Sequence, residues 1–363
     1  MARKLVTVRS IKELRSVPGA SRYQAAIIDG WSCIVKKGVF TTKERVLFFE
    51  VDSFLPPHSQ DARFAPVHNP IHHQVVSWQG RKGIHVKSTM MNKIISQGVV
   101  LKLSQFPEIT DDNSDQCLAE KLGVTKWELT RKELATTLGK PPAFIPSTDL
   151  ERVQNCTNLF TAKYKDSVFQ ESTKMDGSSM TVYFVRHDSC WRKSLRDLPP
   201  GSKSEMLNGR FGVCSRNADI PETAKSTFWD VALKNHLPQK LARVNRNVAI
   251  QGELCGSSIQ QNRHGFRKGD HEFFVFSIFD IDTQERFAPA ETVERAQQLN
   301  LKHVPVHGDV KIHDIATSVE DLLKRAEGTY DNGKKREGLV FKNLGNDRSF
   351  KIIANNYLLT HGE

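Results

Sequence analysis

The first third of the chain alternates short apolar runs with turn residues. Strand-like runs occupy residues 5–8, 25–28, 31–35, 46–51 and 99–103. Asp29-Gly30 is a turn signal between two of these runs, and Pro56-Pro57 ends another. Many short strands with little helical spacing are typical of a small barrel or sandwich. We therefore expect residues 1–110 to form a small β-barrel.

The pattern changes between residues 111 and 146. An acidic and polar stretch opens at Asp111, and Pro141, Pro142 and Pro146 follow. Clusters of polar residues and prolines favour irregular chain. We predict a linker over 111–146, with a short helix around 117–122.

From residue 147 onward, apolar strands alternate with longer helical patterns. Strands are predicted at 181–185, 248–254, 273–280 and 338–342, and helices at 292–299 and 318–327. A further helix is predicted to begin near Leu150, with Ser147, Thr148 or Asp149 as its cap. Residues 147–363 should thus form an α+β domain with largely antiparallel sheets.

Composition narrows the class of protein. No run approaches the roughly 20 apolar residues that a membrane-spanning helix needs, so a membrane protein is not expected. The N-terminus lacks the apolar core of a secretory signal. Six scattered cysteines without a CxxC pair fit a reducing compartment. These features indicate an intracellular protein, cytoplasmic or nuclear.

The positive charge is unevenly distributed. The net charge is +11, but residues 1–110 hold 16 Lys and Arg against 7 Asp and Glu, while the remainder holds 36 against 34. An exposed basic module attracts polyanions, and counterion release drives such binding largely without reading the base sequence. The charge therefore predicts that the first module holds a nucleic acid and that any chemistry lies elsewhere.

Lys174 stands in the segment with the most chemical content. The run Lys174-Met-Asp-Gly precedes a strand, and a lysine beside a glycine turn can lie at the mouth of a pocket. An amine becomes a nucleophile near neutral pH when burial or nearby cations depress its pKa. Alone, this four-residue pattern is weak, and a surface turn is its ordinary interpretation.

The segments that follow strengthen the pattern because they supply the other parts that nucleotidyl transfer needs. They provide carboxylates for a divalent cation, aromatic rings for a base, and cations for phosphates. In chain order they are Ser215-Arg216-Asn217, Gly252-Glu253, Phe273-Phe274-Val275-Phe276, Glu337-Gly-Leu-Val-Phe-Lys342 and Ser349-Phe-Lys351-Ile-Ile353.

With these segments in order, residues 150–360 resemble the covalent nucleotidyltransferase superfamily of ATP-dependent RNA and DNA ligases and mRNA capping enzymes. Its adenylyltransferase domain is of the ligase type and is unrelated to the ATP-grasp fold. The chain is most similar to RNA ligases that carry an extra OB-type module at the N-terminus. Segments 16–22, 50–56 and 95–99 carry the resemblance to that module, and 148–155 resembles the start of the catalytic domain.

The resemblance implies a three-step reaction. Lys174 would attack the α-phosphorus of ATP and form lysyl-AMP. AMP would then pass to a 5′-phosphate end, and a 3′-hydroxyl would displace it and seal the strand. The implied roles are Arg216 at phosphate or the acceptor end, Glu253 near the ribose and a metal, Phe273 against adenine with Phe274 as its rival, Glu337 at the metal, and Lys342 and Lys351 near the α-phosphate.

The implied partners are RNA or an RNA-containing duplex, ATP, and Mg²⁺ or Mn²⁺, with the protein a monomer. Many ligases have a second lysine two positions after the one equivalent to Lys351, and Ile353 stands there. The chain ends soon after Lys351, so we expect no C-terminal OB domain, which argues against a capping enzyme or a standard DNA ligase. A DNA or mixed nick-sealing ligase and a non-catalytic nucleic-acid-binding relative remain as alternatives.

Overall fold

The computed structural model describes residues 4–57, 59–67, 75–78, 80–92, 94–109, 118–127, 137–345 and 348–361. Its contacts divide the chain into two compact units. The first unit contains Met1–Thr130, Val153–Thr157 and Asn355–Glu363, and the second unit contains Arg131–Arg152 and Asn158–Ala354. Within the described residues, no helix is long and apolar enough to cross a membrane.

The first unit is built from short strands, as predicted, and these strands pair antiparallel. They are β1 (Val6–Ser10), β2 (Glu13–Ser16), β3 (Tyr23–Ile28), β4 (Trp31–Lys36), β5 (Arg45–Phe49), β6 (Ser53–Leu55), β7 (Val75–Trp78), β8 (Arg81–His85), β9 (Thr89–Met91), β10 (Ile94–Ser96), β11 (Val99–Lys102) and β12 (Thr125–Lys126). Their sheets have the orders β1-β5-β11, β2-β3-β4, β12-β6-β8-β7 and β10-β9. Phe49, Phe64 and Phe106 fill one apolar core, and Trp31 and Phe48 fill another.

Part of the predicted linker packs into the first unit. The expected short helix is α1 (Leu118–Lys121), and β12 after it pairs with β6. The chain also returns to this unit at Asn155, whose side-chain oxygen accepts hydrogen bonds from Trp31 Nε1 at 3.1 Å and Arg9 Nη2 at 3.2 Å. The unit that the contacts define thus extends beyond residue 110 and is not one continuous segment.

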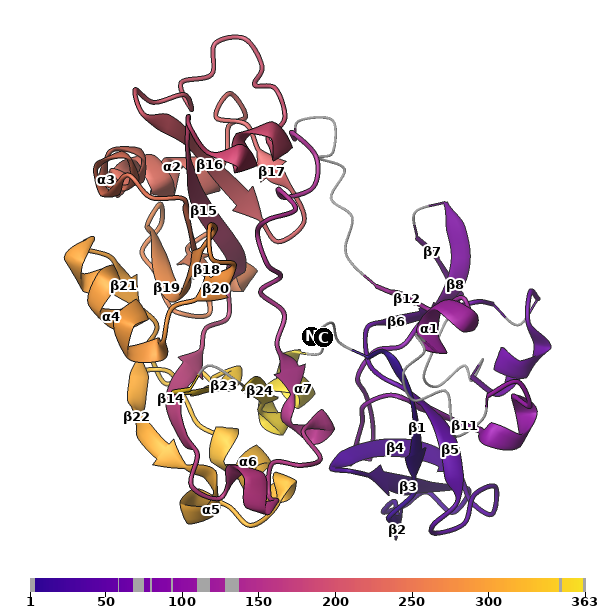
Figure 1. The fold of residues 1–363 in the computed structure, drawn as a ribbon. Coiled ribbons are helices and arrows are strands. Elements are labelled where there is room, and N and C mark those ends of the chain that lie inside the picture. Colours follow the sequence, from indigo (N-terminus) through magenta and orange to yellow (C-terminus); the bar gives the residue numbers. More distant parts are fainter. Residues whose placement is uncertain are drawn as a thin grey trace. The chain divides into compact units, whose positions relative to one another are not determined.

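The second unit contains two sheets, which Figure 1 shows. The five-stranded sheet has the order β13-β24-β23-β14-β22, from Glu151–Arg152, Ser349–Ile353, Gly338–Asn343, Val168–Lys174 and Val306–Lys311. The seven-stranded sheet has the order β17-β16-β15-β18-β19-β20, from Asp219–Ile220, Gly209–Ser215, Ser178–Arg186, Val248–Gly256, His271–Asp280 and Glu285–Arg286, with β21 (Lys302–His303) on β19. All pairs are antiparallel except β13 with β24 and β21 with β19. The predicted α+β class with largely antiparallel sheets is confirmed.

Helices pack beside both sheets. The α-helices are α2 (Thr227–Lys234), α3 (Leu237–Val244), α4 (Pro289–Gln298), α5 (Ile312–Ile315), α6 (Val319–Ala326) and, in the first unit, α7 (Asn355–His361). Short 3₁₀ turns are η1 (Ala62–Val67), η2 (Leu103–Gln105), η5 (Val153–Asn155), η6 (Ala162–Tyr164), η7 (Cys190–Ser194) and η8 (Gln260–Asn262). The two helices predicted near 292–299 and 318–327 are present, and Ser318 Oγ caps α6 by accepting from the N–H of Asp321 at 3.2 Å.

The helix predicted near Leu150 is absent, and that prediction is wrong. Glu151–Arg152 instead forms β13, which runs parallel to β24, and Val153–Asn155 is a single 3₁₀ turn. Asp149 does not cap a helix but forms ion pairs with two cations of the second unit. Strand pairing therefore overrides the local capping signal.

Candidate active site

Lys174 lies at the junction of the two sheets of the second unit. It is the last residue of β14 and pairs with Gly338 of β23, and the chain then turns through Gly177 into β15 of the other sheet. A Cβ at Gly177 would lie 2.8 Å from Cγ of Glu253 and 2.5 Å from the carbonyl oxygen of Leu254. Only glycine therefore lets this turn pass so close to β18, and the turn brings Lys174 toward Glu253.

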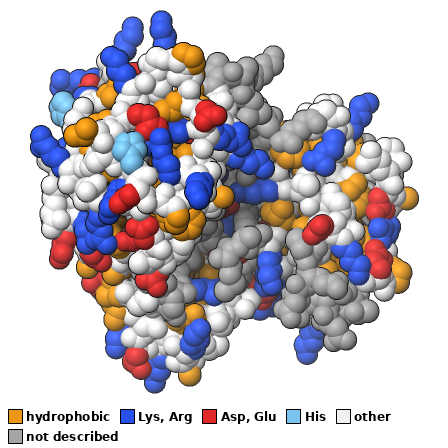
Figure 2. All heavy atoms as spheres, turned by 45° about the horizontal axis from the view of Figure 1, so that its top comes forward, with side chains coloured by type: hydrophobic (Ala, Val, Ile, Leu, Met, Phe, Trp, Pro, Cys, Tyr) orange, Lys and Arg blue, Asp and Glu red, His pale blue; other side chains and the backbone are white. Residues whose placement is uncertain are grey.

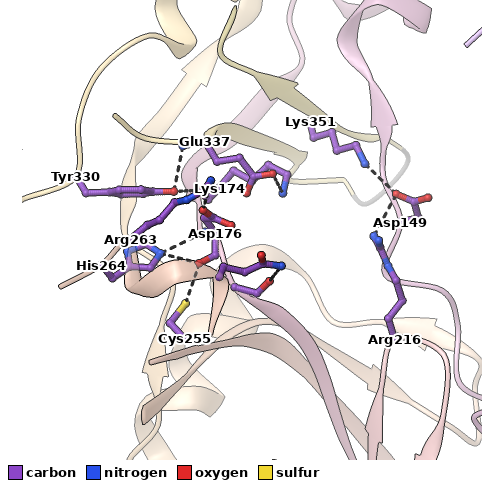
Figure 3. Close-up of polar contacts among 12 residues, drawn as sticks. Asp149, Lys174, Asp176, Arg216, Cys255, Arg263, His264, Tyr330, Glu337 and Lys351 are labelled. Carbon is purple, nitrogen blue, oxygen red and sulfur yellow. Dashed lines mark hydrogen bonds and ion pairs between the residues drawn. The ribbon is translucent and has the colours of Figure 1, made fainter. Parts of the chain in front are cut away.

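Lys174 and Glu337 form a close ion pair, which Figure 3 shows. Lys174 Nζ lies 2.7 Å from Glu337 Oε1, and the side chains are 22% and 15% exposed. Burial lowers the pKa of Lys174, but the charges of Glu337 and Glu253 outweigh burial, so its pKa is raised. The resting side chain is thus an ammonium that carboxylates hold.

Glu253 is the second carboxylate near Lys174. Burial raises its pKa to about 8, the charges of Glu337 and Asp176 add to the rise, and Lys174 and Arg216 oppose it. Burial likewise raises the pKa of Glu337, against the opposing charge of Lys174. Two carboxylates thus share one desolvated space with a single lysine, and each carboxylate would be easier to ionise beside an added cation.

Tyr330 ties the two members of the ion pair together through their backbones. Its hydroxyl donates to the carbonyl oxygen of Lys174 at 3.1 Å and accepts from the N–H of Glu337 at 3.0 Å (Figure 3). This bridge continues the β14–β23 ladder beyond its last pair, Lys174 with Gly338. Nothing in the sequence motifs indicated Tyr330, because its role depends on a loop that returns to the strand ends.

Asp176 is held by residues that the sequence motifs left unassigned. Arg263 Nη1 lies 2.9 Å from Asp176 Oδ2, and both side chains are nearly buried. His264 Nε2 lies 3.1 Å from the carbonyl oxygen of Asp176 and 3.2 Å from its backbone nitrogen. Burial lowers the pKa of His264, although Asp176 opposes that effect. The loop at 263–264 therefore fixes the turn that follows Lys174.

A second polar group joins Lys351 and Arg216, one from each sheet. Lys351 Nζ lies 2.9 Å from Asp149 Oδ1, and Arg216 Nη2 lies 3.6 Å from the same oxygen (Figure 3). Lys351 comes from β24, and Arg216 directly follows β16. Two predicted phosphate-binding residues are thus brought together, with Asp149 as a partner that the motifs did not indicate.

Lys342 points to a different place from Lys351. Its Nζ donates to the carbonyl oxygen of Phe276 and lies 5.6 Å from the centre of that ring. Burial lowers its pKa to about 7, and the charge of Arg286 adds to this shift. Lys342 therefore lies against the aromatic strand β19.

Phe273 is fully buried in the apolar core with Met180 and Ile250, so it has no surface to offer a base. Phe274 lies partly buried beside Met175 and Cys255, next to the Lys174 turn. Successive strand residues point to opposite faces, and Phe274 pairs with Glu253 across β18 and β19. Phe273 therefore belongs to the apolar core, and Phe274 lies on the strand face that it shares with Glu253.

The carboxylates of the site do not form a complete metal cage. Across the residues that the structure describes, no group of three or more His, Cys, Asp or Glu side chains is arranged to hold an ion. Mg²⁺ is usually bound by one or two carboxylates together with phosphate oxygens and waters. The donor set of Glu253 and Glu337 fits that kind of site.

A lysine that is desolvated beside carboxylates, at the junction of two antiparallel sheets, fits a nucleotidyltransferase of the covalent type. A family model described as RNA ligase matches residues 167–353, and one described as an OB-fold domain matches residues 5–103. The chain therefore belongs to the RNA ligase family. This confirms the predicted family, enzyme class and N-terminal OB fold.

Solved structures of one RNA ligase match the whole chain. The Naegleria gruberi RNA ligase with PPi is 34% identical, with a TM-score of 0.80, and the match covers 99% of each chain. A mutant of that ligase with ATP and Mn is 34% identical, with a TM-score of 0.79 and coverage of 99% and 98%. A further mutant with AMP and Mn is 33% identical, with a TM-score of 0.80 and 99% coverage of both chains. No curated protein matched the chain.

Proposed function

We propose that this RNA ligase joins a 5′-phosphate end to a 3′-hydroxyl RNA end, with ATP as the source of a lysyl-AMP intermediate on Lys174. The observation that carries this proposal is the desolvated Lys174, 2.7 Å from Glu337 at the junction of two sheets. Use of ATP and a divalent cation is supported by the similar Naegleria ligase, whose structures include ATP with Mn and AMP with Mn.

The first step forms a phosphorus–nitrogen bond. Lys174 Nζ loses its proton and attacks the α-phosphorus of ATP, and pyrophosphate leaves with the electron pair of the broken P–O bond. The raised pKa of Lys174 opposes this loss while Glu253 and Glu337 are negative. A divalent cation on these carboxylates would offset their charge, lower the pKa of Lys174 and stabilise the phosphates.

The remaining residues receive roles that follow from their positions. Glu253 and Glu337 would hold Mg²⁺ or Mn²⁺, because they are the two carboxylates whose charges act on Lys174. Arg216 and Lys351 bind phosphate oxygens, and Phe274 stacks on adenine from the face that it shares with Glu253. Lys342, which lies on the same face of the five-stranded sheet as Lys174 and Lys351 and contacts Phe276, binds the nucleotide near its α-phosphate.

RNA holding is assigned to the first unit. Its ring cluster places Trp127 parallel to His85, at 4.3 Å and 12°, and 5.1 Å from Trp78, with the Arg81 guanidinium 5.8 Å from the Trp78 ring. Aromatic rings beside cations bind single-stranded nucleic acid by stacking and charge. Figure 2 shows Lys and Arg side chains spread over the face drawn and mixed with acidic ones.

The proposal includes a monomer that acts inside the cell, in the cytoplasm or nucleus. Five cysteines in the described part of the chain are free thiols, which suits a reducing compartment. They are Cys33, Cys156, Cys190, Cys214 and Cys255.

Self-adenylylation tests the proposal directly. Incubation with α-labelled ATP and magnesium should label the protein, and Lys174→Ala should abolish the label. Lys311→Ala is a matched control, because Lys311 is a surface lysine paired with the exposed Asp166 and should keep full labelling. An unlabelled wild-type protein, or a labelled Lys174→Ala variant, would contradict the proposal.

RNA ligation is distinguished from DNA nick sealing by the sugar of the strand that carries the 3′-hydroxyl. We expect faster sealing of a nick whose 3′-hydroxyl strand is RNA than of an otherwise identical all-DNA nick. Equal rates on the two nicks would assign the enzyme to nick sealing without regard to sugar.

The proposed binding of RNA by the first unit is tested by removing the ring of Trp127. Trp127→Ala should slow the sealing of RNA about tenfold, since stacking contributes roughly 1–3 kcal/mol per base, and should leave self-adenylylation unchanged. An equal loss of sealing and self-adenylylation in this variant would contradict the proposal that the first unit binds RNA.

A further inference from the structure

Asp149 occupies the place between the two cations to which we assign the phosphates. Its Oδ1 lies 2.9 Å from Lys351 Nζ and 3.6 Å from Arg216 Nη2. We propose that Asp149 is an internal competitor for the phosphates of the nucleotide, whose carboxylate must release Lys351 and Arg216 before ATP can use them. This inference rests on the proposed function, in which these two residues bind phosphate.

The position of Asp149 is set by the segment that precedes it. The carbonyl oxygen of Pro146 accepts from Gln251 Nε2 at 2.8 Å, and that of Ser147 accepts from Arg286 Nη2 at 2.9 Å. Thr148 Oγ1 lies 3.0 Å from Ser179 Oγ. Residues 146–148 are thus fastened to the seven-stranded sheet, so Asp149 is presented to Lys351 of the other sheet from a fixed backbone.

Asp149 and the phosphates compete for Lys351 more than for Arg216. The side chains of Lys351 and Asp149 are 11% and 13% exposed, whereas Arg216 is 51% exposed and farther from the shared oxygen. A nearly buried lysine gains much from an anionic partner, while an exposed pair gains little. A carboxylate and a phosphate therefore compete chiefly for Lys351 Nζ.

The proposal predicts the direction in which ATP affinity changes when Asp149 is neutralised. With Asp149 in place, ATP gains its contact to Lys351 only after the existing ion pair is broken. Neutralising Asp149 without changing its shape removes this cost and leaves Lys351 more dependent on phosphate. Asp149→Asn should therefore strengthen ATP binding, whereas a residue that positions Lys351 for catalysis would weaken activity when neutralised.

The test compares the KM for ATP and kcat of self-adenylylation in the full-length protein. We expect Asp149→Asn to lower KM about tenfold and to leave kcat within about twofold, as one buried charge interaction of roughly 1.4 kcal/mol implies. Asp149→Glu, which keeps the charge, should stay near the wild-type KM. Asp166→Asn removes a surface carboxylate of the same unit and controls for a general change in charge.

Binding without chemistry provides the second readout. In a Lys174→Met background, calorimetry with ATP and magnesium should show tighter binding when Asp149→Asn is added. An unchanged or weaker affinity, or a loss of kcat at constant KM, in a variant with normal thermal unfolding would overturn the competitor role. A wild-type protein that fails to label would instead contradict the proposed function, so the two failures are distinguishable.

Discussion

The second unit contains two clusters that each place a carboxyl group with a raised pKa near a tyrosine hydroxyl. The first is the Lys174 cluster, with Glu253, Glu337 and Tyr330. The other is the Asp219 cluster, in which Asp219 accepts from the Tyr183 hydroxyl at 3.0 Å and contacts Cys214 Sγ at 3.6 Å. Burial raises the pKa of Asp219 to about 6, although the Tyr183 hydrogen bond opposes the rise.

The two clusters differ in what can reach them. In the Lys174 cluster, a nucleophile and a carboxylate remain partly exposed where two sheets meet. Asp219 is almost fully buried within one sheet, and a Cβ at Gly212 would lie 2.1 Å from the Tyr183 ring, so this space is already filled. A perturbed carboxyl pKa therefore does not define an active site unless a nucleophile lies beside it and substrate has access.

The largest expected difference concerns the two carboxylates. Glu337→Gln should slow self-adenylylation about 100-fold, because charge stabilisation in a desolvated site is among the largest catalytic contributions. Asp219→Asn should stay within about threefold of wild type, since its partners in the described residues are Tyr183, Cys214 and backbone groups. Single-turnover labelling at saturating ATP measures both. A similar loss in the two variants would break the comparison.

The two tyrosines provide a matched pair with a smaller effect. Tyr330→Phe takes a hydrogen-bond partner from the carbonyl of Lys174 and the N–H of Glu337, and an unpaired buried polar group costs roughly 1–3 kcal/mol. We expect kcat of self-adenylylation to fall about tenfold with little change in the KM for ATP.

Tyr183→Phe is the control, because it also removes one buried hydroxyl from the same unit. It should lower thermal stability while labelling stays within about twofold of wild type. If Tyr330→Phe, like Tyr183→Phe, lowered thermal stability without slowing labelling, then Tyr330 would be structural and would not position Lys174.

Sequence patterns identified the elements and residues whose signals are local. Strand alternation located β15, β18 and β19, and the ordered motifs identified Lys174, Glu253 and Glu337, which the structure brings together. The strand predictions succeeded because alternation is local, and the motif residues lie close together because adjacent strands carry them.

Three features of the site could not be predicted from local sequence patterns. Tyr330 acts through a loop that returns to the ends of β14 and β23, and its own sequence neighbourhood has no motif. The local sequence around Asp149 is typical of a helix cap, but the residues that follow it form β13, which pairs with the distant strand β24. Phe273 and Phe274 are chemically alike, so only the register of β19 decides which of them faces Glu253.

The smallest expected effect on catalysis, and a clean one on stability, comes from the titration of Asp219. Its pKa is about 6 in the folded protein and near 3.8 when unfolded, so folding favours the protonated form, with Arg210 and Arg196 opposing. Stability from this group is complete below pH 4 and is lost as the pH rises through 6. Asp219→Asn stays neutral, so its melting temperature relative to wild type should rise between pH 4 and 7. A difference that stays constant across this range would mean that Asp219 does not titrate there, and that burial perturbs carboxylates only in the Lys174 cluster.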